Sequence, residues 1–193
     1  VLTSNMIRNA IQEAKKFRYN GVIEWLQGLQ NILNKLADVS QDKERLVRCE
    51  EFTRSVAMVV DYDELIVELE LAADEIRKKQ RRSYLGGIAT FLEEWKGDDE
   101  GFTRIITHRE GAAGSFVVLS YSCLDPALVT KPLFSQIHAG VIMSGTLKPA
   151  FMYADVLGIS NSVQQEYPSP FPPENKLSLV VPETSTKYNL RGE

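Results

Sequence analysis

The first half of the chain repeats apolar positions at intervals of three and four residues, the spacing of one face of an α-helix. Five such stripes follow one another, so residues 1–96 are predicted to form a nearly all-helical bundle with short connections. Thr3 or Ser4 is the expected N-cap of the first helix, and Asn20-Gly21 the break before the second. The stripes lie within residues 4–17, 22–36, 46–60, 65–76 and 85–95, and a polar linker lies around residues 40–42.

Beyond Gly97 the pattern changes from helical spacing to strands. Residues 104–108 and 115–121 are predicted to be strands of a β-hairpin that closes the helical unit, with a glycine-bounded loop between them. A short helix is expected after Asp125-Pro126, then a buried apolar strand at 140–143 and a helix at about 149–157, which together make an α/β unit. Four prolines then predict an extended path before a strand at 177–181.

The charge balance excludes a global basic field. The chain has 22 basic and 26 acidic residues and a net charge of -4, so any contact with nucleic acid must be local. Its 44% hydrophobic content is enough for a sizeable core. The chain opens at Val1 directly into helical periodicity, which favours an excised fragment. No apolar run is long enough to span a bilayer, so no membrane contact is expected.

Few residues offer metal or nucleophile chemistry. Cys49 and Cys123 lack CxxC spacing, so no zinc or iron–sulfur site is predicted, and both are expected to be reduced, buried thiols. His108 and His138 have no nearby nucleophile partner and are expected to be structural or surface residues. The acidic run at 98–100 is flanked by glycines, which favours a solvated turn over a metal site.

The segment VIMSGTLKP at 141–149 holds the most specific candidate. Ser144, Gly145 and Thr146 would follow the buried strand, where many nucleic-acid motors couple ATP to movement. From the tripeptide alone, the favoured interpretation is that Thr146 caps the helix entered through Pro149. No glycine-rich GxxxxGK[ST] loop for phosphate occurs in the 193 residues, so the chain looks like part of a motor only.

Two further sets of residues are candidates for contact with nucleic acid. Five cations near one helix end could bind phosphates with a salt-dependent affinity, or could form a solvated helix end: Arg77, Lys78, Lys79, Arg81 and Arg82. Aromatic residues interleaved with cations in the tail could stack on unpaired bases, although packing as loop anchors is favoured: Tyr167, Phe171 and Tyr188, with Lys187 and Arg191.

Three segments in this order resemble the XPD family of superfamily 2 DNA helicases. They are CLDPA at 123–127, VIMSGTLKPAFMYADVLGI at 141–159 and YPSPFPPEN at 167–175. The resemblance implies that residues 1–125 are the arch domain, a helical insertion with a β-hairpin. It implies that residues 126–157 return into the first RecA-like motor domain, and that residues 158–193 begin the second. The implied fold is a mainly α-helical arch followed by partial α/β RecA-like segments.

The same resemblance implies a function. The parent protein would be an ATP-dependent 5′ to 3′ DNA helicase of nucleotide excision repair, and this chain would shape the passage for single-stranded DNA. A protein-docking, regulatory scaffold without direct DNA contact is the alternative. Ser144, Gly145 and Thr146 would couple nucleotide state to strand movement, whereas Met143 and Lys148 differ from some relatives.

The family's remaining chemistry would be supplied from outside this chain. No catalytic or metal residue is expected here, so the chain alone should not hydrolyse ATP; ATP, magnesium and a 4Fe-4S cluster would be bound by other segments. Expected partners are single-stranded DNA, the remaining motor and iron–sulfur domains, and a repair protein on the arch. The residues of the SGTLKP segment suggest a cytoplasmic, archaeal-like protein.

Overall fold

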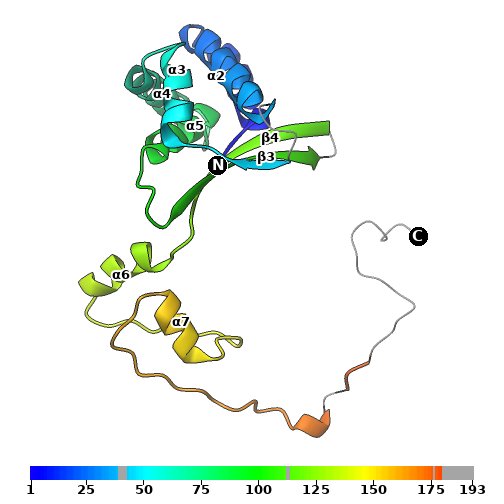
Figure 1. The fold of residues 1–193 in the computed structure, drawn as a ribbon, viewed down its shortest axis with the longest axis vertical. Coiled ribbons are helices and arrows are strands. Elements are labelled where there is room, and N and C mark those ends of the chain that lie inside the picture. The colour runs from blue at the N-terminus through cyan, green and yellow to red at the C-terminus, as the bar shows by residue number, and fades with distance from the viewer. Residues whose placement is uncertain (39–42, 112–113, 176, 180–193) are drawn as a thin grey trace.

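The computed structural model describes residues 1–38, 43–111, 114–175 and 177–179. Within these ranges the chain forms seven α-helices, one short 3-10 helix and four strands (Figure 1). The helices are α1 (Ser4–Phe17), α2 (Gly21–Asp38), α3 (Cys49–Ala57), α4 (Tyr62–Arg77), α5 (Tyr84–Trp95), α6 (Ala127–Gln136), α7 (Ala150–Val156) and η1 (Pro173–Asn175). The strands are β1 (Leu2–Thr3), β2 (Glu44–Leu46), β3 (Phe102–Gly111) and β4 (Gly114–Cys123).

Local signals set the bounds of the first five helices, which confirm the predicted stripes. The Thr3 side chain caps α1 by accepting a hydrogen bond from the Met6 amide at 3.0 Å. Asp61 and Ser83 cap α4 and α5 in the same way. The third stripe was only partly right, because Leu46 lies exposed in β2 rather than in a helix. The predicted linker at 40–42 lies outside the described residues.

The hairpin is the centre of a four-stranded antiparallel sheet with the order β1-β4-β3-β2. Strands β3 and β4 pair along their whole length, from Phe102 opposite Cys123 to Gly111 opposite Gly114, which confirms the predicted hairpin but with longer strands than the expected 104–108 and 115–121. Strand β1 pairs Leu2 with Leu119, and β2 pairs with β3 from its other side. The two outer strands were not predicted, because two or three residues are too few to display an alternating pattern.

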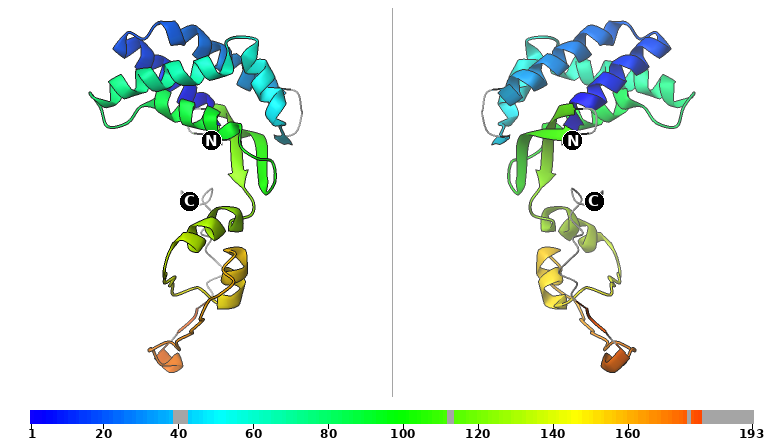
Figure 2. Two further views of the ribbon diagram at one scale, coloured as in Figure 1. Left: turned by 90° about the vertical axis from the view of Figure 1, so that its left-hand side faces the viewer. Right: turned by 90° about the vertical axis from the view of Figure 1, so that its right-hand side faces the viewer.

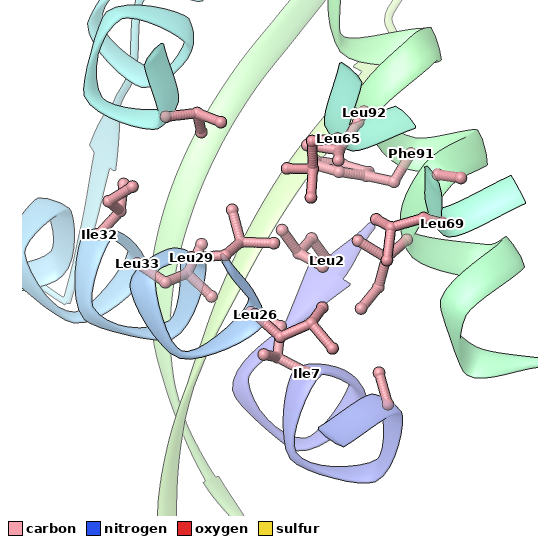
Figure 3. Packing of buried hydrophobic residues seen from close by; sticks show 14 of the residues in the cluster. Leu2, Ile7, Leu26, Leu29, Ile32, Leu33, Leu65, Leu69, Phe91 and Leu92 are labelled. Carbon is pink, nitrogen blue, oxygen red and sulfur yellow. The ribbon is translucent and has the colours of Figure 1, made fainter. Parts of the chain in front are cut away.

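One hydrophobic core fills the space between the helices and the sheet. Side chains from β1, α1, α2, α4 and α5 converge there in Figure 3, where Leu2 lies among Leu26, Leu29 and Leu69. Trp95 is the largest of the fully buried side chains and contacts the rings of Phe52 and Phe91. Every buried residue of the described chain lies at or before Leu119. The core therefore belongs to the helical unit and its sheet.

Arg104 joins the helical unit to the hairpin. It is buried on β3, with its guanidinium 4.4 Å from the ring centre of Tyr121 and 5.2 Å from that of Trp95. It donates hydrogen bonds to the carbonyl oxygens of Trp95 at 2.8 Å and Gly97 at 2.5 Å, and it pairs with Asp99. A cation thus meets the carbonyl groups where α5 ends, which is the favourable end of the helix dipole for positive charge.

The segments after the hairpin have a different character. Helices α6 and α7 lie beyond the open end of the hairpin, apart from the helical unit (Figure 2). Both confirm predicted helices, yet neither has a buried residue. The predicted buried strand at 140–143 was wrong: these residues have no regular structure, and Val141 is 88% exposed. A buried strand needs neighbouring strands on its edges, and the described part of this chain provides none there.

The proline-rich tail follows an extended path, as predicted, apart from the short turn of η1. The strand expected at 177–181 is not seen at 177–179, and its last two positions lie outside the described residues. No helix in the described ranges is both long and apolar enough to cross a membrane.

Candidate nucleic-acid interface

The predicted basic cluster lies where α4 ends and the turn to α5 begins. Arg77 is the last residue of α4 and Lys78 is its C-cap, and all five cations of the cluster are exposed. Arg77 pairs with Asp74 at 2.8 Å and Lys78 pairs with Glu75 at 2.5 Å, both within α4. The Glu75 carboxylate, by its hydrogen bond, raises the pKa of Lys78 above its ordinary value. Such exposed pairs contribute little to stability, so these cations stay available for other anions.

A second basic segment, which sequence reasoning missed, joins this cluster. It is the end of α1, where Lys15, Lys16 and Arg18 are exposed. The ammonium of Lys16 lies 5.1 Å from the ring centre of Phe17, and that of Lys79 lies 5.8 Å from it. Two segments more than sixty positions apart in sequence therefore share one aromatic ring. We call the combined set the α1/α4 basic surface: Lys15, Lys16, Arg18, Arg77, Lys78, Lys79, Arg81 and Arg82.

The buried carboxylate of Glu13 holds the two segments together. Glu13 is only 6% exposed, and its Oε1 accepts a hydrogen bond from the Gln80 side-chain amide at 2.6 Å. Its Oε2 accepts from the Ser83 hydroxyl at 2.9 Å and from the Leu85 amide at 3.0 Å. The last turn of α1 is thereby fixed against the α4–α5 turn. One signal could have revealed this residue, because Glu13 falls on the apolar face of α1, three positions after Ala10.

Acidic residues confine this positive surface to one end of α4. The body of α4 has no basic residue before Arg77 and exposes six carboxylates: Asp63, Glu64, Glu68, Glu70, Asp74 and Glu75. The positive charge is therefore local, as the net charge of -4 predicted.

The Ser-Gly-Thr segment is an exposed loop before α7. The Ser144 and Thr146 hydroxyl oxygens lie 3.2 Å apart, and the Ser144 hydroxyl also accepts a hydrogen bond from the Thr146 amide at 3.2 Å. The prediction favoured from the tripeptide alone, that Thr146 caps α7, was wrong, because Pro149 occupies the cap position and no side chain bonds there. These contacts lie within the loop, and both hydroxyl-bearing residues are exposed at the surface.

Only some of the aromatic and basic candidates in the tail lie within the described residues. Tyr167 and Phe171 are exposed, so the favoured prediction that they pack as loop anchors was wrong. Nearby, Glu166 pairs with Lys148 at 2.8 Å, which lowers the Glu166 pKa. The remaining tail candidates lie outside the described residues: Lys187, Tyr188 and Arg191.

The other titratable groups have structural surroundings. Cys49 is half-buried and its thiol lies 3.4 Å from the Trp95 carbonyl oxygen; burial is the main reason that its pKa is raised. Cys123 is exposed, so the expectation of two buried thiols was wrong for this residue. His108 lies 3.4 Å from the Ala37 carbonyl oxygen, and His138 is exposed. No group of three potential metal ligands occurs in the described part of the chain.

Comparison with known proteins relates part of this chain to helicase subunits. It is 26% identical over 127 residues to the Saccharomyces cerevisiae "General transcription and DNA repair factor IIH helicase subunit XPD/RAD3", covering 62% of this chain and 16% of the yeast protein. It is 34% identical over 71 residues to the corresponding XPD subunit of Schizosaccharomyces pombe, covering 36% of this chain and 9% of that protein. No family model matches.

The chain therefore combines a helical unit and a small antiparallel sheet with a relationship to XPD/RAD3 helicase subunits over part of its length. It spans less than a fifth of either relative.

Proposed function

We propose that this chain is part of an ATP-dependent 5′ to 3′ DNA helicase of nucleotide excision repair. In this proposal residues 1–125 are an arch domain that shapes the passage of single-stranded DNA. Residues 126–157 belong to a first RecA-like motor domain, and residues 158–193 begin a second. The relationship to subunits named for DNA repair supports the helicase class.

The observation that carries the DNA contact is the α1/α4 basic surface. Two of its eight exposed cations, Lys16 and Lys79, lie over the Phe17 ring, and the hydrogen bonds of buried Glu13 join the two segments that bear all eight. Cations held in this way neutralise successive phosphates and release their counterions, whereas an unconnected helix end offers only a few charges. The half-buried Phe17 ring, which both lysines approach, would add an aromatic surface for unpaired bases.

The C-terminal segments contribute contacts rather than chemistry in this proposal. Their apolar side chains are exposed along both helices, including Leu128, Val129, Leu133, Phe151 and Met152. Contiguous exposed apolar residues mark a surface that another part of a protein covers. We assign the remaining motor as that cover, and Ser144, Gly145 and Thr146 as the loop that passes nucleotide-dependent movement on to the DNA-binding parts.

The residues present do not fit the cofactors of the family. A 4Fe-4S cluster needs four cysteine ligands, and this sequence has two, one half-buried and one exposed. The sequence also lacks a phosphate-binding GxxxxGK[ST] loop for ATP and its magnesium ion. In this proposal both groups are held by other segments of the helicase.

Salt-dependent binding tests the proposed DNA contact. We expect Lys79→Ala/Arg81→Ala/Arg82→Ala to weaken binding to a thymidine oligonucleotide, because three phosphate contacts are lost. The slope of log affinity against log salt should flatten by about 2, at roughly 0.7 per contact on a single strand. Fluorescence anisotropy across a salt series measures both quantities. Arg77 is left intact because its guanidinium lies against Gly86 of α5.

A matched control removes the same charge elsewhere. Lys43 precedes β2, Arg48 is the N-cap of α3 and Arg54 lies within α3; all three are exposed, and their triple alanine variant should bind as tightly as the parent chain. Equal losses in both variants would contradict a localised contact, since a non-specific effect of net charge would then explain the data.

The docking scaffold remains a second candidate because of one observation on α4. Val67 and Leu71 are exposed one turn apart among the carboxylates of that helix, including Glu64, Glu68 and Glu75. An apolar pair ringed by acids suits a partner segment that has apolar and basic residues. An unchanged affinity and salt slope in the Lys79/Arg81/Arg82 variant would contradict DNA contact and favour this candidate.

A further inference from the structure

An open groove with a volume of about 470 Å³ lies at the other end of α1 from the basic surface. Its walls come from three directions: Arg8 on α1, Gln30 and Asn34 on α2, and His108 and Phe116 on the paired strands β3 and β4. We call it the Phe116 groove. None of these residues belongs to the basic cluster or to the Ser-Gly-Thr loop.

The groove combines an aromatic surface with amide groups. Phe116 lies on strand β4 and is half-buried, and its side chain lines the groove. An exposed aromatic face stacks on any nucleobase, because every base has a π-face. His108 adds a second ring, anchored by the contact of its Nε2 with the Ala37 carbonyl oxygen at 3.4 Å.

The amides supply hydrogen-bonding groups of both kinds. Gln30 donates from Nε2 to the Asn34 Oδ1 at 3.3 Å across one turn of α2. That bond leaves Gln30 Oε1 as an acceptor and the Asn34 Nδ2 hydrogens as donors. Each nucleobase presents neighbouring donors and acceptors along its edge. An acceptor and a donor one helical turn apart can therefore bond to a base edge without strong preference for one base over another.

Cations on α1 connect the groove to the basic surface. Arg8 lines the groove, and Lys15 lies seven residues further along the same exposed face of α1, a rise of about 10 Å. Gln12, between them, is also exposed and uncharged, so no acidic side chain on this face interrupts the line. Phosphates that follow α1 would thus meet positive charge at both ends of the helix.

We propose that the Phe116 groove binds one unpaired base of a single DNA strand whose phosphates follow α1 to the α1/α4 basic surface. Phe116 stacks on the base, Gln30 and Asn34 bond to its edge, and Arg8 contacts the adjoining phosphate. This inference rests on the proposed DNA contact and adds to it a subsite that recognises bases rather than phosphates.

Two probes separate base binding from phosphate binding. One is a labelled thymidine oligonucleotide of about twelve nucleotides, and the other is a strand of the same length built from abasic tetrahydrofuran residues. The parent chain should bind the thymidine strand about tenfold more tightly, because only that strand offers a base to stack. Both strands should show the same salt slope, since their phosphates are alike.

Two sets of variants then locate the base. Phe116→Leu keeps an apolar side chain on β4 but removes the aromatic ring, and it should erase most of the preference for thymidine without changing abasic binding. Gln30→Ala/Asn34→Ala should reduce that preference about fivefold. The matched controls are Gln27→Ala/Asn31→Ala, exposed amides of the same helix outside the groove, and Phe151→Leu on α7. Both should retain the full preference.

The outcomes separate this inference from the proposed function. Salt-dependent binding of both strands with an undiminished preference in Phe116→Leu would overturn the groove while leaving the DNA contact intact. Equal binding of the thymidine and abasic strands by the parent chain would overturn it as well. Failure of the parent chain to bind either strand would contradict the proposed DNA contact itself, and with it the groove. Circular dichroism of each variant verifies that the helices are retained.

Discussion

The helical unit with its sheet and the segments that follow it have similar apolar patterns but opposite burial. Leu33 on α2 is 0% exposed, whereas Leu133 on α6 is 58% exposed, although each lies in a correctly predicted helix. An observed and an expected strand differ in the same way: Leu119 is buried between β1 and β3, while Val141 is 88% exposed and, in the described part of the chain, lies in no strand. An apolar pattern therefore predicts which side chains favour burial, whereas their actual burial depends on the segments that pack around them.

Replacing the matched leucines gives the largest expected difference between the two regions. Leu33→Ala leaves a cavity in the packed core and should lower the free energy of unfolding by about 2–5 kcal/mol. Leu133→Ala removes an already exposed side chain and should change it by less than about 0.5 kcal/mol. Urea denaturation followed by tryptophan fluorescence, from Trp25 and Trp95, measures both. Similar losses in the two variants would mean that α6 shares the core.

Arg104 provides the next largest effect, because within the first region it joins the helical unit to its sheet. Arg104→Gln should cost about 2–3 kcal/mol, since the carbonyl oxygens of Trp95 and Gly97 lose buried charged donors. Its partner Asp99 is highly exposed, so Asp99→Asn should cost about 1 kcal/mol at most. The same denaturation assay applies. A larger loss in Asp99→Asn than in Arg104→Gln would contradict the role assigned to the carbonyl contacts.

A smaller, pH-dependent effect distinguishes two carboxylates. The Arg45 guanidinium, by hydrogen bonds of 2.6 and 3.2 Å, holds the pKa of Glu51 below its ordinary value of 4.5. The resulting stability is present above pH 4.5 and is lost as the pH falls through the lowered pKa, because the unfolded chain then binds the proton first. In the parent chain, the free energy of unfolding should fall between pH 7 and pH 3. In Glu51→Gln that fall should be smaller by up to about 1 kcal/mol.

Glu166 is the control for that measurement. Lys148 lowers its pKa too, but this pair is exposed and lies outside the packed unit. Glu166→Gln should therefore leave the difference in unfolding free energy between pH 7 and pH 3 as it is in the parent chain. An equal change in both variants would show that the tail contributes to the cooperative unit.

A similarly small effect is expected from removing the second region altogether. A chain that ends at Cys123 retains every buried residue of the described structure. Its thermal midpoint should shift by less than about 4 °C, which corresponds to about 1 kcal/mol in a domain of this size. Calorimetry measures this midpoint, and loss of a single cooperative transition would contradict the independence of residues 1–123.

Much of the packed unit could be predicted from its sequence, because each helix has its own periodic stripe and three of them, α1, α4 and α5, begin at a side-chain cap. Strands β1 and β2 could not, since two or three residues take their pairing from distant partners. The candidate interface was half predictable. The cations at the end of α4 are adjacent in sequence, but their union with the end of α1 depends on the Glu13 hydrogen bonds across some seventy positions. The strand expected at 140–143 failed because an apolar run does not specify its neighbours.

The pairing of β1 with β4 has a topological consequence. Leu2 lies opposite Leu119, so the stretch of chain that enters the helical unit runs antiparallel beside the stretch that leaves it. Adjacent strands are separated by about 4.8 Å, whatever length of chain lies between them. The chain therefore enters and leaves the unit at adjacent positions. In a longer polypeptide that carried this unit as an insertion, the two flanking segments would need to be separated by only about the width of one strand, so the host fold would be little disturbed.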